Sequence, residues 1–319
     1  MIKPGSEAKY LLDYKHGRIK KGMPINCDFD NFWLHKKSNL NLLLGHDNVG
    51  KSYWIFWYFL NLCLRNDLKV CLYAGENQKG QILRDLIQMY SGIKFSDIPD
   101  NKILSHSAFL EQYFYFVPNN KIYKPEELLE IFKNSDCEIG LIDPFTALKR
   151  EYSYSGNYEF LNLARQFVND SGMTIYINTH PTSESGRSGN LYPQGHDWAG
   201  MLKAPLKDHI EGGKSFLNRS CNMLVLHRLI KSPTMKYYTM ISTEKIKDLD
   251  SGGNYTPLDQ PLLFEFNSGL GFKINGVDPL QDLRPNGTIS KSFPVKKDSP
   301  QSPPFFPQSP QTQINDLPF

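Results

Sequence analysis

One stretch of the chain fits the pattern GxxxxGK[ST]: Gly45-His46-Asp47-Asn48-Val49-Gly50-Lys51-Ser52. It directly follows the apolar run 41–44, which is typical of a strand. Glycines at both ends let the backbone curl so that successive N–H groups point inward, and a helix that begins at Lys51 adds its positive end. We therefore expect a strand, a phosphate-binding loop and a helix. The alternative is a chance glycine-rich turn.

The residue types of this loop also predict its ligands. Lys51 would reach the β- and γ-phosphates of a nucleoside triphosphate, and the Ser52 hydroxyl would hold Mg²⁺. All eight residues of the loop are therefore candidates for cofactor binding, and the expected cofactors are ATP and Mg²⁺.

Length and composition limit the remaining possibilities. A chain of 319 residues suits one large α/β domain with appendages. Its net charge of +3 means that any contact with nucleic acid must be local. The five cysteines include no C-x-x-C pair, which favours a reducing compartment.

No signal peptide is expected from the first residues. Charged residues between Lys3 and Asp13 come before any apolar stretch, so we expect a cytoplasmic protein. The longest apolar run, residues 53–64, is too short to span a bilayer and follows the phosphate loop. It is interpreted as a buried helix, and no membrane span is expected.

Strand and helix patterns alternate from residue 39 onward. Such alternation predicts an α/β fold, with a mostly parallel sheet covered by helices on both faces and further strands added at its end. The predicted strands lie at 40–44, 68–74, 113–117, 138–143, 173–179, 221–228, 236–245 and 261–266, and the predicted helices at 51–66, 79–91, 125–134 and 157–171.

Composition divides the chain into three predicted parts. Residues 1–38 are polar and are interpreted as an arm or linker, and residues 39–283 as an ATPase domain. Residues 284–319 are rich in Pro, Ser and Gln and are expected to be a disordered tail. Within the domain, residues 181–213 lack an apolar period and predict a long functional or mobile loop.

Three further strands end in polar side chains. Asp143 ends an apolar strand and is expected to hold Mg²⁺ directly or through water. Glu76 follows another strand, where a carboxylate can polarise water for attack on the γ-phosphate, or alternatively cap the next helix. His180 can contact the γ-phosphate, although a histidine at a strand end can also be an ordinary hydrogen-bonded residue.

In this order the motifs resemble the RecA-like motor domain of DnaB/Twinkle-type hexameric replicative helicases, in particular the phage primase-helicase branch. The resemblance covers about residues 25–275. It is carried by the P-loop at 45–52, Glu76, Asp143, His180-Pro181 and the stretch 208–228, which looks like a small-residue turn, a short helix and a strand ending in arginine.

The resemblance implies roles for individual residues. Glu76 would be the catalytic base, His180 the phosphate sensor, and the loop 181–213 the element that faces single-stranded DNA. Arg187, Lys203 and Lys207 are its candidate phosphate contacts. Separated cations, with Tyr192 and Trp198 as stacking faces, suit a single strand physically, whereas the alternative is an ordinary solvated loop.

One position departs from the family pattern. In the family, a Lys-x-Arg pair sends its arginine into the neighbouring subunit's nucleotide site, but here the matching residues are Lys245-Ile246-Lys247. Lysine is a point charge and lacks the bidentate fork of arginine, so a slow ATPase is expected. Arg228 can share the task. A hexameric ring is what the resemblance implies for assembly.

The last residues suggest a docking role. The tip Asp316-Leu317-Pro318-Phe319 is similar to that of bacterial single-stranded DNA-binding proteins, whose terminal Phe enters an apolar pocket on replication proteins. Bacterial tips usually carry several acidic residues, and this tip has only Asp316. The alternative is a tail end with no partner.

The predicted function is that of an ATP-dependent replicative DNA helicase motor. The alternatives are a helicase loader or regulatory switch with the same fold but no unwinding, and a hub that recruits replication proteins through its tip. A small-molecule kinase is disfavoured, because no acceptor pocket or arginine-bearing lid can be located in the sequence.

Overall fold

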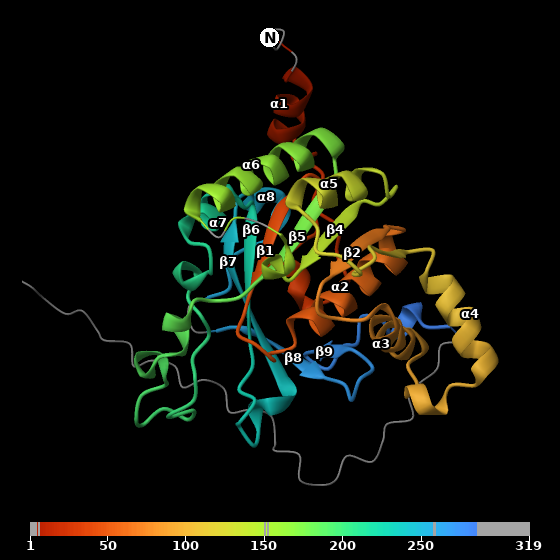
Figure 1. Cartoon of the computed structure of the whole chain (residues 1–319), viewed down its shortest axis with the longest axis vertical. Helices are drawn as coiled ribbons and strands as arrows, with labels where there is room; N and C mark the ends of the chain where they lie inside the picture. The colour runs from red at the N-terminus through yellow and green to blue at the C-terminus, as the bar shows by residue number, and fades with distance from the viewer. Residues whose placement is uncertain (1–4, 6, 150, 152, 258–259, 286–319) are drawn as a thin grey trace, which may run out of the picture. The chain divides into compact units, whose positions relative to one another are not determined.

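A nine-stranded sheet forms the centre of the protein (Figure 1). The computed structural model describes residues 5, 7–149, 151, 153–257 and 260–285. The strands are β1 (Leu40–Leu44), β2 (Val70–Ala74), β3 (Phe114–Phe116), β4 (Ile139–Asp143), β5 (Thr174–Thr179), β6 (Asn222–His227), β7 (Tyr238–Ile246), β8 (Leu262–Phe266) and β9 (Phe272–Ile274).

The strand order is β3-β2-β4-β5-β1-β6-β7-β8-β9. The strands from β3 to β6 in this order are parallel, and β7, β8 and β9 continue the sheet in antiparallel pairs. This confirms the predicted α/β fold, with a mostly parallel sheet extended by antiparallel strands. The carboxyl ends of β1, β2, β4 and β5 therefore meet at one edge, which we call the P-loop edge.

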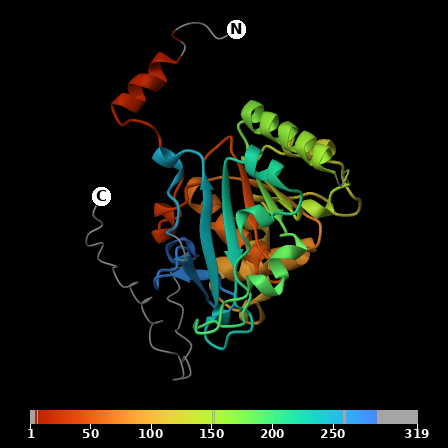
Figure 2. The ribbon, with the colours of Figure 1, turned by 90° about the vertical axis from the view of Figure 1, so that its left-hand side faces the viewer.

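Helices cover both faces of the sheet. The α-helices of the described residues are α1 (Ala8–Lys15), α2 (Lys51–Asn66), α3 (Lys79–Ser91), α4 (Asp100–Leu110), α5 (Pro125–Lys133), α6 (Tyr154–Ser171), α7 (Lys214–Arg219) and α8 (Leu249–Gly252). Buried side chains of α2 and α3 pack on one face, and those of α5, α6 and α7 on the other. Figure 2 shows α6 and α7 on one side of the sheet and α1 projecting away from it.

Burial on both faces explains why the strands are continuous apolar runs. In β1, Leu43 packs with the α2 face while Leu42 and Leu44 pack with the α6 face. All five residues of β4 are buried in the same way. A parallel strand covered on both sides has no solvent-facing row, so its sequence does not alternate.

Aromatic side chains fill the core on the α2 face. Trp54 stacks on Tyr58 at 5.3 Å between ring centroids, and Phe29 meets Phe264 edge-on at 5.4 Å. Such pairs contribute roughly 0.5–1.5 kcal/mol each beyond the area they bury. Phe29 and Trp33 are at most 1% exposed, so part of the segment before residue 39 packs into this core. The three-part division of the chain stays a prediction.

Most predicted helices and strands are present, with boundaries shifted by a few residues. Helix α6 begins at Tyr154, before the predicted 157, because the Ser153 hydroxyl caps it by accepting from the amide of Gly156 at 3.0 Å. Four of these elements were missed. Helix α4 buries only Leu110, helix α1 buries none of its residues, and α8 and β9 are four and three residues long, so none gives a clear apolar period.

The C-terminal tail and its tip, including Asp316-Leu317-Pro318-Phe319, lie outside the described residues. No helix among the described residues has both the length and the apolar character needed to cross a bilayer.

Candidate nucleotide site and the adjoining loop

The P-loop connects β1 to α2, in the predicted order. A Cβ added at Gly45 would lie 2.5 Å from the carbonyl oxygen of Leu226, so no larger residue fits there. Gly50 has φ +89°, a left-handed conformation that glycine adopts without strain, and α2 begins at the next residue. These two glycines let the backbone turn tightly at the helix N-terminus, as anion binding requires.

Lys51 folds back over the loop. Its Nζ donates to the carbonyl oxygens of Gly45 at 2.7 Å and His46 at 2.9 Å, and the residue is 7% exposed. Burial lowers the pKa of Lys51, while nearby carboxylates, Asp143 first among them, raise it. The ammonium is thus held by neutral carbonyls, and phosphate oxygens would be stronger partners for it.

Asp143 ends β4 and is 3% exposed. Its Oδ1 accepts from Asn178 Nδ2 at 2.7 Å, while Oδ2 is buried with no hydrogen-bond partner in the described part of the chain. Burial raises the pKa of Asp143, and contacts with Ser52, Asn178 and Lys51 oppose that change. An unpartnered carboxylate oxygen next to a serine hydroxyl fits Mg²⁺, which prefers oxygen ligands.

A cavity of about 950 Å³ joins these residues into one site. Its lining includes P-loop residues, Glu76, Asp143, His180 and residues 181–183 and 185–186. Glu76 is exposed and follows β2, where the amide of Gly75 donates to the carbonyl of Asp143 at 2.8 Å. The two carboxylates predicted from separate strands therefore face the same space, although their roles stay predictions.

His180 contacts the P-loop itself. Its Nδ1 lies 2.7 Å from Oδ1 of Asp47, an ion-pair distance, but the atoms are not aligned for a hydrogen bond. Asp47 is exposed at the mouth of the cavity. The predicted sensor is therefore next to the place where phosphates are expected to bind, and it has a carboxylate neighbour that the sequence reasoning did not identify.

The segment between β5 and α7, which we call the β5–α7 loop (residues 180–213), is more ordered than its composition suggests. Its ends pair, because the amide of Thr182 donates to the carbonyl of His209 at 2.6 Å and that of Glu211 to His180 at 2.9 Å. Tyr192 and Met201 pair further out, through an amide–carbonyl bond of 2.8 Å. The loop therefore leaves β5 at the P-loop edge and returns to the same edge before α7 begins.

The aromatic residues of this loop pack on one another. Tyr192 stacks on His196 at 4.4 Å between ring centroids and meets Trp198 edge-on at 5.2 Å. Both Tyr192 and Trp198 also pack against a small apolar cluster that contains Leu229 and Met240. These contacts anchor the loop to the β6–β7 hairpin, so the rings support the loop in addition to any stacking role.

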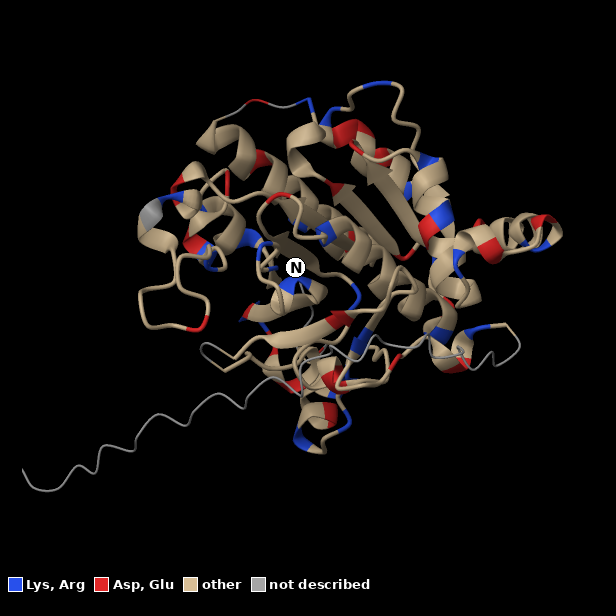
Figure 3. Cartoon of the chain, turned by 90° about the horizontal axis from the view of Figure 1, so that it is seen from below, with Lys and Arg blue, Asp and Glu red and all other residues tan. Residues whose placement is uncertain are grey.

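The three cations proposed for DNA contact are all exposed. Arg187 lies 3.9 Å from Glu184, Lys203 stands 5.7 Å from the Tyr192 ring centroid, and Lys207 begins a short 3-10 turn. Figure 3 shows that the positions of Lys and Arg are interspersed with those of Asp and Glu along the ribbon. Any phosphate contact by these residues is therefore local, as the small net charge predicts.

The sequence reasoning missed cations in the β6–β7 turn, next to the loop. Lys231 lines a second cavity, of about 330 Å³, together with Leu191 and Met201 of the loop. Lys236 lies over the ring of exposed Tyr237, 5.1 Å from its centroid. The available signal was a short lysine-containing segment between two strands, at 228–237.

The three candidates for a finger in the neighbouring subunit lie in different places. Arg228 is at the P-loop edge, where its Nε donates to the carbonyl of Lys236 at 2.6 Å. Lys245 is held inside the fold by the carbonyls of Ser220 and Leu217.

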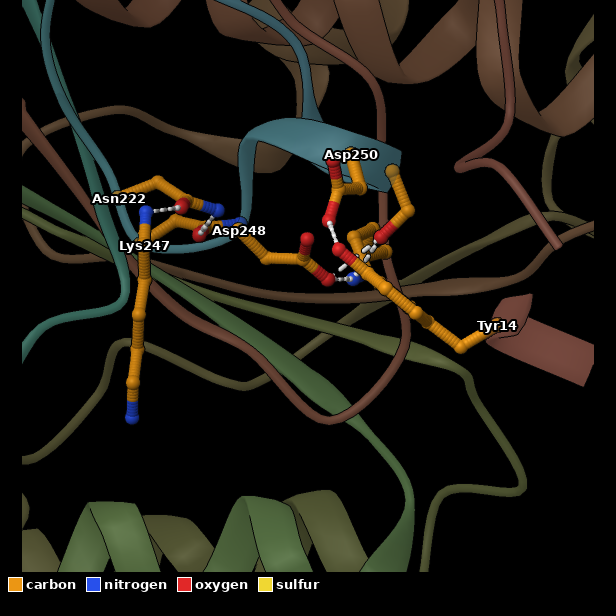
Figure 4. A network of polar contacts seen from close by, with 8 residues as sticks. Tyr14, Asn222, Lys247, Asp248 and Asp250 are labelled. Atoms are coloured by element: carbon orange, nitrogen blue, oxygen red, sulfur yellow. Dashed lines mark hydrogen bonds and ion pairs between the residues drawn. The ribbon is translucent and has the colours of Figure 1, made fainter. Parts of the chain in front are cut away.

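Lys247 is exposed just beyond the end of β7. Its amide donates to Asn222 Oδ1 at 3.1 Å, and Figure 4 shows its side chain pointing away from the surrounding polar network. Because β7 ends beside the start of β6, this residue lies at the sheet edge opposite the P-loop. It cannot face the nucleotide cavity of its own chain.

Sheet order, P-loop placement and the paired carboxylates define a RecA-like P-loop NTPase fold. Many solved structures are similar to the chain, among them the two that follow. One, a separately solved ATPase domain, has a TM-score of 0.66 at 12% identity and covers 85% of this chain and 99% of its own. The other, a DnaB-like replicative helicase studied with primase, has a TM-score of 0.63 at 12% identity and covers 85% of this chain and 67% of its own.

These similarities confirm, at the level of the fold, the resemblance to the motor domain of DnaB-like replicative helicases. No family model matches the sequence, and no curated protein matches it. At 12% identity the comparison concerns the fold, and the activity is argued from the site.

Proposed function

We propose that this chain is a P-loop ATPase that acts as a replicative DNA helicase motor, coupling ATP hydrolysis to translocation on single-stranded DNA. The single observation that carries the proposal is the shared cavity. The P-loop, Glu76, Asp143 and the first residues of the β5–α7 loop line one space of about 950 Å³. A nucleotide in that space would touch the loop that carries the exposed cations. The similar structures, an ATPase domain and a DnaB-like replicative helicase, support the same function.

In this proposal each residue of the cavity has one task. Lys51 leaves its two carbonyl partners and binds the β- and γ-phosphates of ATP. Ser52 and Asp143 would hold Mg²⁺, and when bound the ion would supply positive charge that neutralises the phosphate oxygens. Glu76 accepts the proton of the attacking water, and His180 contacts the γ-phosphate and responds to its loss. Asn178 orients Asp143 by donating to its Oδ1.

Contacts beyond the single chain belong to the same proposal. Arg187, Lys203 and Lys207 bind phosphates of single-stranded DNA. Subunits assemble as a hexameric ring, in which exposed Lys247 enters the nucleotide cavity of the adjacent copy in place of an arginine. Arg228 and Lys245 are less suited to this role, because each already donates to carbonyls of its own chain.

A second candidate function is favoured by one observation. The exposed residue after β7 is Lys247, and lysine lacks the planar fork with which arginine stabilises a transferring phosphoryl group. A slow ATPase suits a helicase loader or regulatory switch that uses ATP only to change conformation. Recruitment of replication proteins through the C-terminal tip is a separate prediction that concerns residues outside the described part of the chain.

Strand displacement on forked DNA separates the two functions. The motor is expected to show DNA-stimulated phosphate release together with displacement, whereas stimulated release without displacement supports the loader or switch. Native mass in the presence of ATP-Mg²⁺ and oligo-dT tests the assembly. A six-fold mass supports the ring, and a persistent monomer contradicts it.

A further inference from the structure

His46, the second residue of the P-loop, is hydrogen-bonded to the β5–α7 loop. Its Nε2 lies 3.0 Å from the hydroxyl oxygen of Ser185. The Ser185 hydroxyl has one proton, which it donates to the carbonyl of Thr182 at 2.8 Å. It must therefore accept from His46, so the imidazole carries its proton on Nε2 and donates to the loop.

The surroundings favour this neutral form of the imidazole. Burial lowers the pKa of His46, and the nearby Lys51 ammonium lowers it further. Ser185 is 2% exposed, so water does not compete freely for its oxygen. The Nδ1 atom of His46 has no hydrogen-bond partner within the described residues. The single Nε2–H bond to Ser185 therefore fixes the orientation of the ring.

The main chain of His46 is connected to the phosphate-binding lysine. Its carbonyl oxygen accepts from Lys51 Nζ at 2.9 Å, next to the carbonyl of Gly45 at 2.7 Å. Phosphate oxygens that draw the ammonium into the cavity would remove it from these carbonyls. The peptide group of His46 would then lose a charged partner, while its ring still holds the loop.

A second histidine is hydrogen-bonded to the same loop, at a position later in its sequence. His227, 3% exposed at the end of β6, donates from Nε2 to the carbonyl of Leu202 at 2.8 Å. Its ring meets that of His46 edge-on at 5.8 Å between centroids. A shift of His46 would therefore affect two hydrogen bonds to the loop, its own to Ser185 and that of His227 to Leu202.

We propose that His46 is a positioning residue that transmits nucleotide binding to the β5–α7 loop through its hydrogen bond to Ser185. The inference rests on the proposed function, because the signal begins when ATP phosphates engage Lys51. It adds to the proposed function a second connection between the nucleotide and the loop. This connection runs through the side chain of His46 in the P-loop, whereas the first runs through His180 at the end of β5. The bond to Ser185 makes loop position depend on the state of the P-loop.

Hydrogen–deuterium exchange of the full-length protein tests this coupling. In the wild type, a non-hydrolysable ATP analogue with Mg²⁺ is expected to change the exchange of amides in residues 182–209. In Ser185→Ala this nucleotide-dependent change should fall to less than a third of the wild-type value. Gln194→Ala, a change at an exposed polar residue of the same loop that does not line the nucleotide cavity, is the control and should keep the full response.

Two variants at His46 separate the hydrogen bond from simple packing. His46→Gln keeps an N–H donor at nearly the position of Nε2 and should retain most of the response. His46→Leu fills similar space without a donor and should lose the response as Ser185→Ala does. Because both partners belong to one bond, the double variant His46→Leu/Ser185→Ala should lose no more than either single variant.

Calorimetric titration of the same samples distinguishes failure of the coupling from failure of the proposed function. A wild-type protein that does not bind the analogue contradicts the proposed ATP-dependent function. A wild type that binds it without a change in loop exchange overturns the coupling alone. The coupling is also overturned if Ser185→Ala and His46→Leu bind the analogue and respond as the wild type does.

Discussion

The two ends of the parallel strands differ in how Lys51 and Lys247 are held. At the P-loop edge, charged groups contact other groups of the same chain: Lys51 donates to two carbonyls, Asp143 accepts from Asn178, and His180 lies beside Asp47. At the opposite edge, Lys247 is exposed and its side chain points away from the neighbouring polar network (Figure 4). The first edge forms a cavity within one chain, whereas the role proposed for Lys247 requires a second chain.

The largest expected effect on ATP hydrolysis comes from removing a charged group at the P-loop edge. Lys51→Ala removes the phosphate-binding ammonium, and Glu76→Gln removes the proposed base. A general base contributes roughly 10²- to 10⁴-fold to the rate of a reaction. Each change should abolish DNA-stimulated ATP hydrolysis, and Glu76→Gln should still bind nucleotide. Phosphate release and analogue titration measure the two properties. A Glu76→Gln protein with normal turnover would show that the base lies elsewhere.

A smaller effect is expected at the opposite edge. Lys247→Ala should lower ATP turnover about tenfold, which corresponds to about 1.4 kcal/mol of barrier, and Lys247→Arg should raise turnover because arginine offers two parallel donors. Phosphate release by the assembled protein with oligo-dT is the measurement.

Mixing two defective variants shows whether Lys247 acts between chains. A Lys51→Ala chain cannot hydrolyse ATP but keeps Lys247, whereas a Lys247→Ala chain keeps Lys51 but lacks Lys247. Their mixture should hydrolyse ATP faster than the average of the two separate samples. Turnover equal to that average would show that Lys247 does not act on a neighbouring chain and would remove the contrast between the edges.

Stability at low pH is expected to depend on buried histidines, one of which lies at the P-loop edge. Burial lowers the pKa of His227 to about 4 and that of His35 to about 3. The unfolded chain, with histidine near 6.5, then binds more protons below that pH, so stability is full above pH 6.5 and falls toward pH 4. The slope approaches about 1.4 kcal/mol per pH unit for each histidine.

Urea unfolding between pH 7 and pH 4.5 checks this dependence. His227→Gln keeps a donor for the Leu202 carbonyl but does not titrate, so its stability should fall less steeply than that of the wild type. Equal slopes in the two proteins would mean that His227 takes up a proton in the folded state as readily as in the unfolded one.

The smallest effect is expected at the hydrogen bond that joins α1 to the edge opposite the P-loop. Tyr14 donates to Asp250 at 3.0 Å, and both residues are exposed (Figure 4). Solvent competes for such a bond, so Tyr14→Phe should leave the thermal midpoint unchanged. Differential scanning calorimetry is the measurement, and a clear fall in the midpoint would show that α1 is part of the cooperative fold.

Much of the fold could be predicted because local patterns agreed with the tertiary environment. Strands β1 and β4 are continuous apolar runs since both of their faces are covered, and α2 begins where the P-loop pattern requires. The prediction missed α1 and α4, whose side chains are mostly not buried. An apolar period reports burial, so an exposed helix gives little signal.

The candidate site was predictable only in part. The positions of Glu76, Asp143 and His180 at strand ends predicted them as site residues, and all three line the cavity. Asn178 and Ser185 gave no signal, because an amide within a strand and a serine within a polar loop are common. Their importance comes from what they touch: Asn178 donates to Asp143 and Ser185 accepts from His46.

By itself, the sequence determined the phosphate-binding loop and the alternation of elements, since glycine spacing and apolar runs act locally along the chain. Only the tertiary structure decided which distant residues meet. It placed Lys247 at the edge opposite the P-loop, because β7 is antiparallel to β6, and it brought Ser185 against His46. The reason is that strand order and loop path follow from packing across the whole core, which no short stretch of sequence records.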